Sequence, residues 1–295
     1  MFLGGEAPGK KAIFGYGTVL MTNLVSSSGV VSGDVTGVGT SRRSLAAAGY
    51  GTDKAIFGYG RTTTGVSMTN LVSSTGVVAA DTTGVGTARA NLAAAGYGTD
   101  KAIFGYGYNT VTPVLVSMTN LVSNTGVVAA DVTGVGTARG NLGAAGYGTD
   151  KAIFGFGSND FSLGTTVSTT NLVSNTGVVG SDVAGVGTER DNTAGAGYGT
   201  DKAIFAYGGL DGANGNLSSL VSNTGVVSAD VSGVGTSRRW IAAAGYGTDK
   251  AIFGYGNVSG SVSMTNLVSN TGVVSADVTG VGTAREQLAA ASYGA

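Results

Sequence analysis

Short apolar stretches separated by turn residues recur along the whole chain. In one well-defined copy, residues 66–72 alternate apolar and polar side chains along much of their length, which is typical of a half-buried β-strand. Residues 45–50 are small, residues 54–60 are hydrophobic and aromatic, and residues 77–81 form a fourth apolar stretch. The glycine, serine, threonine and aspartate residues between them predict turns. We therefore expect four short strands in each copy of the pattern.

The pattern occurs six times, and a lysine at the start of the second predicted strand marks each copy: Lys11, Lys54, Lys101, Lys151, Lys202 and Lys250. The repeat units are 11–53, 54–100, 101–150, 151–201, 202–249 and 250–295. Units of four short strands that cannot bury an apolar face alone are typical of β-propeller blades. A parallel β-helix would need shorter and more uniform units. We therefore predict an all-β fold in one domain, residues 1–295, forming a six-bladed β-propeller with four antiparallel strands per blade.

The two ends of the chain complement each other. The first unit begins at Lys11 with a second strand, whereas residues 285–293 match a first strand that no second strand follows. We expect this C-terminal strand to complete the first blade, because closure removes a free sheet edge. Residues 1–5 align with a degraded first strand and are the alternative occupant of that position.

The copies differ mainly in the connection between the second and third strands. In a four-stranded meander, these connections leave the same face as the links between units, and the other two turns leave the opposite face. We call these the variable face and the invariant face. Candidate ligand-binding residues on the variable face are Arg61, Tyr108, Asn109, Asn159, Asp160, Phe161, Asp211, Asn214 and Asn257 in the connections, with Arg43, Arg239 and Trp240 before the first strands. Trp240, the only tryptophan, is a candidate anchor for a partner, or it covers the channel mouth.

Six aspartate–arginine pairs stand eight residues apart: Asp34/Arg42, Asp81/Arg89, Asp131/Arg139, Asp182/Arg190, Asp230/Arg238 and Asp277/Arg285. Guanidinium groups suit anion binding, so one hypothesis is a ring of arginines at the channel mouth. We favour ion pairs that pin each link between units and join adjacent blades, because structural ion pairs often resemble functional clusters.

The middle strand of every unit carries two aromatic positions, exemplified by Phe57 and Tyr59. We expect them to form layers that pack against glycine of the neighbouring blade. The Thr-Asp-Lys turns, such as residues 52–54, are interpreted as solvated hairpin ends in which each ion pair contributes little.

The composition argues against catalysis. The chain has neither histidine nor cysteine, which removes the commonest general base, thiol nucleophiles, disulfides and most zinc sites. The acids outside the repeat pattern are Glu6, Asp160, Glu189, Asp191, Asp211 and Glu286. They are single and scattered, so we expect no enzyme, cofactor or metal site; a carboxylate-based glycosidase is the remaining enzymatic alternative.

Charge and hydropathy limit the partners. The net charge is −1, which gives no electrostatic basis for binding nucleic acid. No signal peptide or membrane span is recognised, so we expect no membrane insertion; the pattern leaves the localisation unknown, and cytoplasm and virion both fit it.

The order of these features resembles the kelch repeat. The corresponding residues in one unit are Thr87-Ala88-Arg89 and residues 92–95, 101–107, 116–120 and 125–128. The glycine pair here is Gly-Tyr-Gly, and valine replaces the outer-strand tryptophan of the family. The near-identical repeats also resemble those of uncharacterised phage and environmental proteins.

The kelch resemblance implies a binding module. The oxidase members of that family depend on copper held by histidine and a cysteine-linked tyrosine, which this chain lacks. We therefore expect a non-enzymatic module that recognises a protein or glycan partner through the variable face. The alternatives are a structural protein of a phage particle or fibre, assembled with other chains, and an engineered or recently amplified propeller without a selected ligand.

Overall fold

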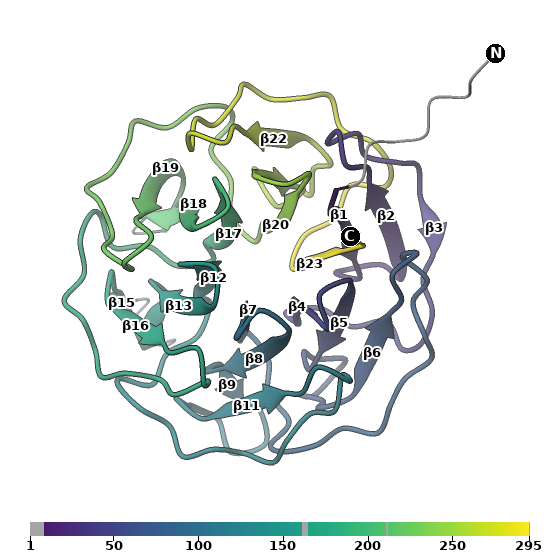
Figure 1. Cartoon of the computed structure of the whole chain (residues 1–295), viewed down its shortest axis with the longest axis vertical. Helices are drawn as coiled ribbons and strands as arrows, with labels where there is room; N and C mark the ends of the chain where they lie inside the picture. Colours follow the sequence, from purple (N-terminus) through teal and green to yellow (C-terminus); the bar gives the residue numbers. More distant parts are fainter. Residues whose placement is uncertain (1–8, 161–164, 211, 295) are drawn as a thin grey trace.

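The computed structural model describes residues 9–160, 165–210 and 212–294. Within these residues the chain is all-β: short antiparallel strands form small sheets, and no helix occurs. The sheets are arranged around a central axis, and the strands of each sheet follow one another outward from it (Figure 1).

The sheet nearest the N-terminus has the order β23 (Ala289–Tyr293), β1 (Lys11–Gly15), β2 (Met21–Val25) and β3 (Val35–Thr36). Five further sheets repeat its first three strands, from the axis outward. They are β4 (Ala46–Tyr50), β5 (Lys54–Gly58), β6 (Thr69–Val72); β7 (Ala93–Tyr97), β8 (Lys101–Gly105), β11 (Thr119–Val122); β12 (Gly143–Tyr147), β13 (Lys151–Gly155), β16 (Thr170–Val173); β17 (Ala194–Tyr198), β18 (Lys202–Leu210), β19 (Ala213–Val221); and β20 (Ala242–Tyr246), β21 (Lys250–Gly254), β22 (Thr265–Val268).

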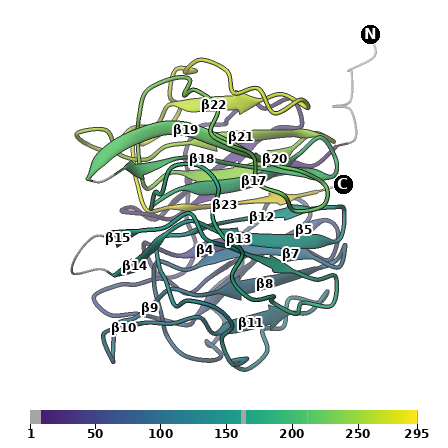
Figure 2. The same ribbon diagram turned by 90° about the vertical axis from the view of Figure 1, so that its left-hand side faces the viewer.

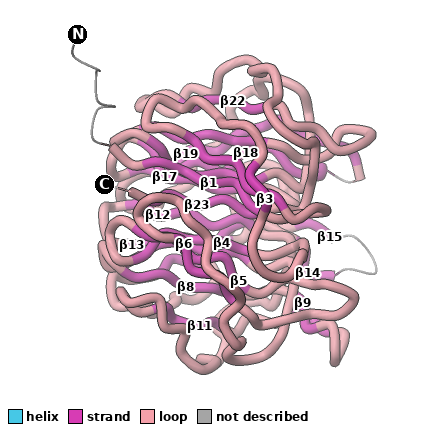
Figure 3. The backbone as a smooth tube through the Cα atoms, turned by 90° about the vertical axis from the view of Figure 1, so that its right-hand side faces the viewer, coloured by secondary structure: helices cyan, strands magenta, loops and turns pink. Residues whose placement is uncertain are grey.

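The variable connections form additional hairpins. One pairs β9 (Tyr108–Asn109) with β10 (Val114–Leu115), and another pairs β14 (Ser158–Asp160) with β15 (Thr165–Thr166). Both hairpins lie at the end of the molecule opposite the C-terminus (Figure 2). The strands run across the molecule between two ends rich in loops (Figure 3).

The C-terminal strand pairs with the first middle strand, as the sequence predicted. β23 pairs with β1 from Lys11↔Tyr293 to Gly15↔Ala289, the register that joins β4 to β5 in the next sheet. The two ends of the chain therefore form one sheet.

The sheets are linked in cyclic order. The inner strands β4, β7, β12, β17, β20 and β23 each contact the next, and β23 contacts β4. Backbone hydrogen bonds between the turns of adjacent sheets follow the same order: Gly98 N donates to Asp150 O at 2.7 Å, and Gly294 N to Asp53 O at 2.7 Å. β23, which belongs to the first sheet, thus contacts the last sheet through β20 and the second sheet through β4.

The prediction of four regular strands in every unit is wrong in part. Within the described residues, the outer segment forms a continuous strand only in the first unit, as β3. In the other units, single β-bridges such as Thr69↔Thr82 and Val72↔Val78 join the outer segment to the third strand. In the first unit a second residue pair, Met21↔Thr36, extends the ladder into β3. In the second unit the segment is held by the single bridges and by the side chain of Asn70, whose Nδ2 donates to Ala79 O at 3.0 Å.

The core lies between adjacent sheets, and the prediction that aromatic rings pack against glycine is confirmed. Phe57 lies edge-on to Tyr16 of the preceding sheet, with ring centroids 5.1 Å apart. A Cβ atom on Gly15 would lie 2.6 Å from Phe57 Cζ. Glycine at this position therefore lets the next sheet approach closely.

Replacing Gly105 by alanine should lower the free energy of unfolding by about 2 kcal/mol, because overpacking displaces a buried ring. The added Cβ would lie 2.6 Å from Phe154 Cζ. The chain offers a matched control in the fifth unit, where Ala206 holds this position and the rings of Tyr207 and Phe253 stand 5.5 Å apart. Ala206→Gly should have the smaller effect in urea denaturation; equal effects would contradict this packing.

Candidate functional site

The variable face brings residues before the inner strands beside residues that follow the middle strands. Backbone bridges join Arg43 to Arg61 and Arg239 to Asn257. The sequence proposed these four residues separately, and the bridges place them in two neighbouring pairs.

Six residues surround the central axis at this face: Ser44, Asn91, Asn141, Asn192, Trp240 and Gln287. All have a positive φ, between 51° and 56°. Backbone hydrogen bonds link successive members: Asn192 N donates to Asn141 O at 2.7 Å, and Gln287 N to Trp240 O at 3.1 Å. In the described part of the chain, no backbone bond joins Trp240 to Asn192. The ring of bonds is therefore interrupted beside the tryptophan.

Trp240 occupies a backbone conformation that disfavours its side chain. Its φ of 55° lies in the left-handed region, which suits asparagine far better than a bulky residue. Arg239 stacks on it, with Cζ 4.4 Å from the ring. The tryptophan therefore carries a conformational cost that the asparagine units avoid, and strained residues tend to cluster at functional sites.

Acidic and basic residues alternate at four consecutive positions of the six beside this ring. The residue that precedes each ring member is, in cyclic order, Asp191, Arg239, Glu286, Arg43, Ala90 and Gly140. Glu286 accepts hydrogen bonds from Asn257 and Ser261. The Nε atoms of Arg61 and Arg239 are buried and have no hydrogen-bond partner among the described residues. Four of the six positions are thus charged, and the other two are small.

Asp191 was not proposed as a site residue, because it is a single acid outside the repeat pattern. Burial raises the pKa of its carboxyl group, against hydrogen bonds from Asn192 and Asn141 and the charge of Arg239. The sequence did contain a signal: Asp191 occupies the repeat position that Arg43 and Arg239, both proposed as site residues, occupy in their units.

Asp191→Asn should stabilise the chain at neutral pH. The pKa of Asp191 is higher in the folded chain than in the unfolded chain. Ionisation of this carboxyl group therefore destabilises the fold once the pH rises above its pKa in the unfolded chain. Thermal unfolding should give the variant a higher Tm than the wild type at pH 7.5. The gap should shrink as the pH falls toward about 4; a gap that widens on acidification would contradict this.

The other proposed residues are distributed around the rim. Tyr108 and Asn109 lie in β9, and the Asn109 side chain accepts from the backbone of Val111. Asn159 and Asp160 lie in β14. Asn214 donates to Val258 O at 2.6 Å and so joins two loops. Phe161 and Asp211 lie outside the described residues.

The predicted pairing of aspartate with the arginine eight residues later is wrong. The ion pairs are Arg42 with Asp81, Arg89 with Asp131, Arg139 with Asp182, Arg190 with Asp230, Arg238 with Asp277, and Arg285 with Asp34. Each arginine precedes the inner strand of a sheet, and its partner follows the third strand of the same sheet. The link of eight residues crosses from the outside of one sheet to the inside of the next, which separates the predicted partners.

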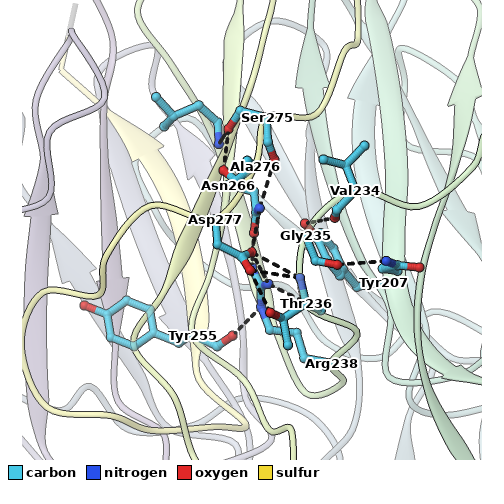
Figure 4. A network of polar contacts seen from close by, with 12 residues as sticks. Tyr207, Val234, Gly235, Thr236, Arg238, Tyr255, Asn266, Ser275, Ala276 and Asp277 are labelled. Atoms are coloured by element: carbon cyan, nitrogen blue, oxygen red, sulfur yellow. Dashed lines mark hydrogen bonds and ion pairs between the residues drawn. The ribbon is translucent and has the colours of Figure 1, made fainter.

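The arginines are structural in their contacts. Arg139 Nε donates to Phe156 O at 3.0 Å, and its NH2 group donates to Asn171 Oδ1 at 2.7 Å. Its Cζ lies 4.4 Å from the ring of Tyr106 in the preceding sheet, so it also joins adjacent sheets. Figure 4 shows the equivalent network around Arg238. All six arginines are buried, which argues against a ring of exposed guanidinium groups at the channel mouth.

The network extends to the links between sheets. The Asp182 carboxylate accepts from Thr137 N at 3.0 Å and from its hydroxyl at 2.7 Å. Burial raises the pKa of Tyr106 to about 12 despite nearby Arg139, so its hydroxyl stays protonated and donates to Val135 O at 3.1 Å. This link is therefore held by side chains of both sheets that it connects.

Sequence reasoning also missed a cavity of about 250 Å³ on the invariant face, lined by the Thr-Asp-Lys turns. Within the described residues, no group of three or more acids could hold a metal ion. That part of the chain also contains no helix suited to crossing a membrane.

No protein-family model matches the sequence, and no curated protein matches it.

Proposed function

We propose that the chain is a six-bladed, kelch-like β-propeller that acts as a non-enzymatic binding module through its variable face. The cyclic contacts of the inner strands and the pairing of β23 with β1 support the propeller. In this proposal, the repeated arginine network stabilises the fold that carries the variable face, and the partner is a protein or a glycan.

One observation carries the functional part of the proposal. On a frame that repeats six times, the additional hairpins, the unpartnered Nε atoms of Arg61 and Arg239, and the strained Trp240 all lie on the variable face. A bulky residue that costs stability is poorly explained by packing that three other units achieve with asparagine. Trp240, stacked by Arg239, is therefore proposed as the anchor.

The shape of the face favours a macromolecular partner. The hairpins β9–β10 and β14–β15 project from the rim, and arginine and tryptophan are enriched among the residues that dominate protein interfaces. We infer a protein partner first, and a glycan stacked on Trp240 is the alternative outcome of the test.

The test compares the wild type with Trp240→Asn in a pull-down from the source organism and on a glycan array. Three other units have asparagine at this position, so the substitution should raise the free energy of unfolding by about 1 kcal/mol. It should also abolish capture of the partner. Asn175→Ala on the invariant face is the control and should retain binding. Equal capture by Trp240→Asn and the wild type would refute the proposed anchor.

A second role, as a building block of a phage particle or fibre, is favoured by one observation. The first valine of the Val-Val pair that follows the turn after the third strand is highly exposed in every unit, for example Val77 at 65% and Val178 at 66%. Repeated exposed apolar side chains suit lateral contacts in an assembly. Sedimentation analysis separates the two roles: assembly that is lost when these valines become serine supports the building block, whereas a strictly monomeric chain refutes it.

A further inference from the structure

The cavity on the invariant face lies on the central axis. Its wall contains an inner-strand residue from every sheet: Gly49, Gly96, Gly146, Gly197, Gly245 and Ser292. Its volume of about 250 Å³ suits a small molecule. The cavity is separate from the proposed partner site, because the turns between inner and middle strands that line it leave the face opposite the variable hairpins.

Cationic side chains dominate the rim. The lysines that line the cavity are Lys10, Lys54, Lys101, Lys151, Lys202 and Lys250. Threonines of five turns join them: Thr52, Thr99, Thr149, Thr200 and Thr248. Ammonium and hydroxyl groups donate hydrogen bonds, so the lining suits a ligand rich in acceptor oxygens.

The lysines are concentrated in one place. All seven lysines of the chain lie in these turns, together with the five turn aspartates Asp53, Asp100, Asp150, Asp201 and Asp249. In the first unit, Lys10 replaces the aspartate of the other units. The turns therefore carry excess positive charge, although the whole chain has a net charge of −1.

Of the five turn aspartates, Asp249 lines the cavity and the other four do not; Asp100 shows how a carboxylate is held away from it. Asp100 accepts from Lys101 at 3.0 Å, and its second oxygen accepts from Asn124 at 3.1 Å. Asn124 follows the third strand, β11, so the carboxylate is fixed on the side away from the axis. The Lys101 side chain is 44% exposed, and exposed ion pairs of this kind are weak. An anion with several charges can therefore draw the ammonium groups toward the axis.

The rim is also preorganised. Backbone hydrogen bonds join each turn to the next, including Gly247 N to Lys10 O at 2.7 Å and Gly51 N to Asp100 O at 2.7 Å. A rigid rim lowers the entropic cost of binding a ligand that contacts several turns at once.

We propose that this cavity binds a small polyanion, a molecule with several phosphate or sulfate groups arranged around a ring or short chain. Lysine ammonium groups are established phosphate ligands, and several anionic groups are needed to contact lysines that surround the axis. A single phosphate would contact one or two turns and compete poorly with the aspartates.

The test is isothermal titration with inositol hexakisphosphate and inorganic tripolyphosphate. We expect one ligand per chain and a Tm that rises when the ligand is present. The affinity should fall as the salt concentration rises from ~0.05 to ~0.3 M, because salt screens interactions between charges. Vesicles that contain phosphatidylinositol bisphosphate form a second arm: binding to them assigns the ligand to a lipid headgroup, and binding to the free probes alone assigns it to a soluble polyanion.

Variants locate the ligand in the cavity. Lys10→Asp restores the turn of the other units and reverses one charge, and it should weaken binding by at least about tenfold; Lys10→Gln should give an intermediate loss. Thr133→Asp, an exposed position in a link between sheets, changes the net charge by the same amount as Lys10→Gln and should leave binding unchanged. Absence of saturable binding, or equal losses from Lys10→Gln and Thr133→Asp, would overturn the proposal. Neither result depends on the partner of the variable face.

Discussion

Deleting residues 285–295 should abolish the cooperative unfolding transition of the chain. These residues include β23, which pairs with β1, and Leu288, Ala291 and Tyr293 fill the cores on its two sides. Arg285 also holds Asp34 at 3.9 Å. The deletion exposes the edge of β1 and two apolar surfaces, so the loss should exceed about 5 kcal/mol, the lower end of typical domain stability. Urea denaturation followed by circular dichroism measures it.

A peptide of residues 285–295 added in trans provides the control. It should restore the transition of the truncated chain, because it can fill the vacant strand position beside β1. The same peptide with Ala291→Asp should fail, since it would place a charge in a core where Ala291 is only 4% exposed. A truncated chain that unfolds at the wild-type midpoint would contradict the closure by β23.

Arg139→Ala should destabilise the chain by about 3 kcal/mol, as expected for removal of one partner of a buried charged network. The side chain is fully buried and donates to Phe156 O, Thr137 O and Asn171 Oδ1. Its loss leaves these acceptors without their donor and opens a void beside Tyr106. Arg42, Arg89 and Arg238 repeat these three contacts in their own units, so the loss measures one link between two sheets.

Arg43→Ala is the matched control for this change. Arg43 is only half-buried and lies on the variable face, so its removal should cost less than about 1 kcal/mol. Chemical denaturation of both variants gives the difference. A loss below about 1 kcal/mol for Arg139→Ala would show that the guanidinium group does not hold adjacent sheets together.

Much of the strand pattern could be predicted from the sequence. Residues 54–58 form β5 and residues 69–72 lie in β6, as the alternation of side chains indicated. The contact between Phe57 and Gly15 followed from aromatic and glycine positions that recur in every unit. These features depend on local periodicity, which a repeated sequence displays many times.

Features that depend on how units face each other were predicted less well. Asp34 and Arg42 are close in sequence, but the chain crosses the width of a sheet between them, and Arg285 is the partner of Asp34. The outer segments were expected to be regular strands, and spacing alone did not show that single bridges such as Thr69↔Thr82 would attach most of them.

The same limitation applies to the candidate sites. The loop residues were identified by their variability, whereas the place of Asp191 beside Arg239 depends on the circular order of the units. Each Thr-Asp-Lys turn looked like an ordinary solvated hairpin, and only the arrangement around the axis gathers the lysines at one cavity. The replacement of aspartate by Lys10 was the signal available in the sequence.

The most direct test of the proposed binding face is photo-cross-linking from two exposed positions of the same unit. Asn159 lies in the β14 hairpin on the variable face, and Asn175 lies in a turn on the invariant face. A photoreactive residue at position 159 should label a partner that Trp240→Asn releases, and a residue at position 175 should not label it. Labelling of the same partner from position 175 alone would contradict the assignment of the variable face.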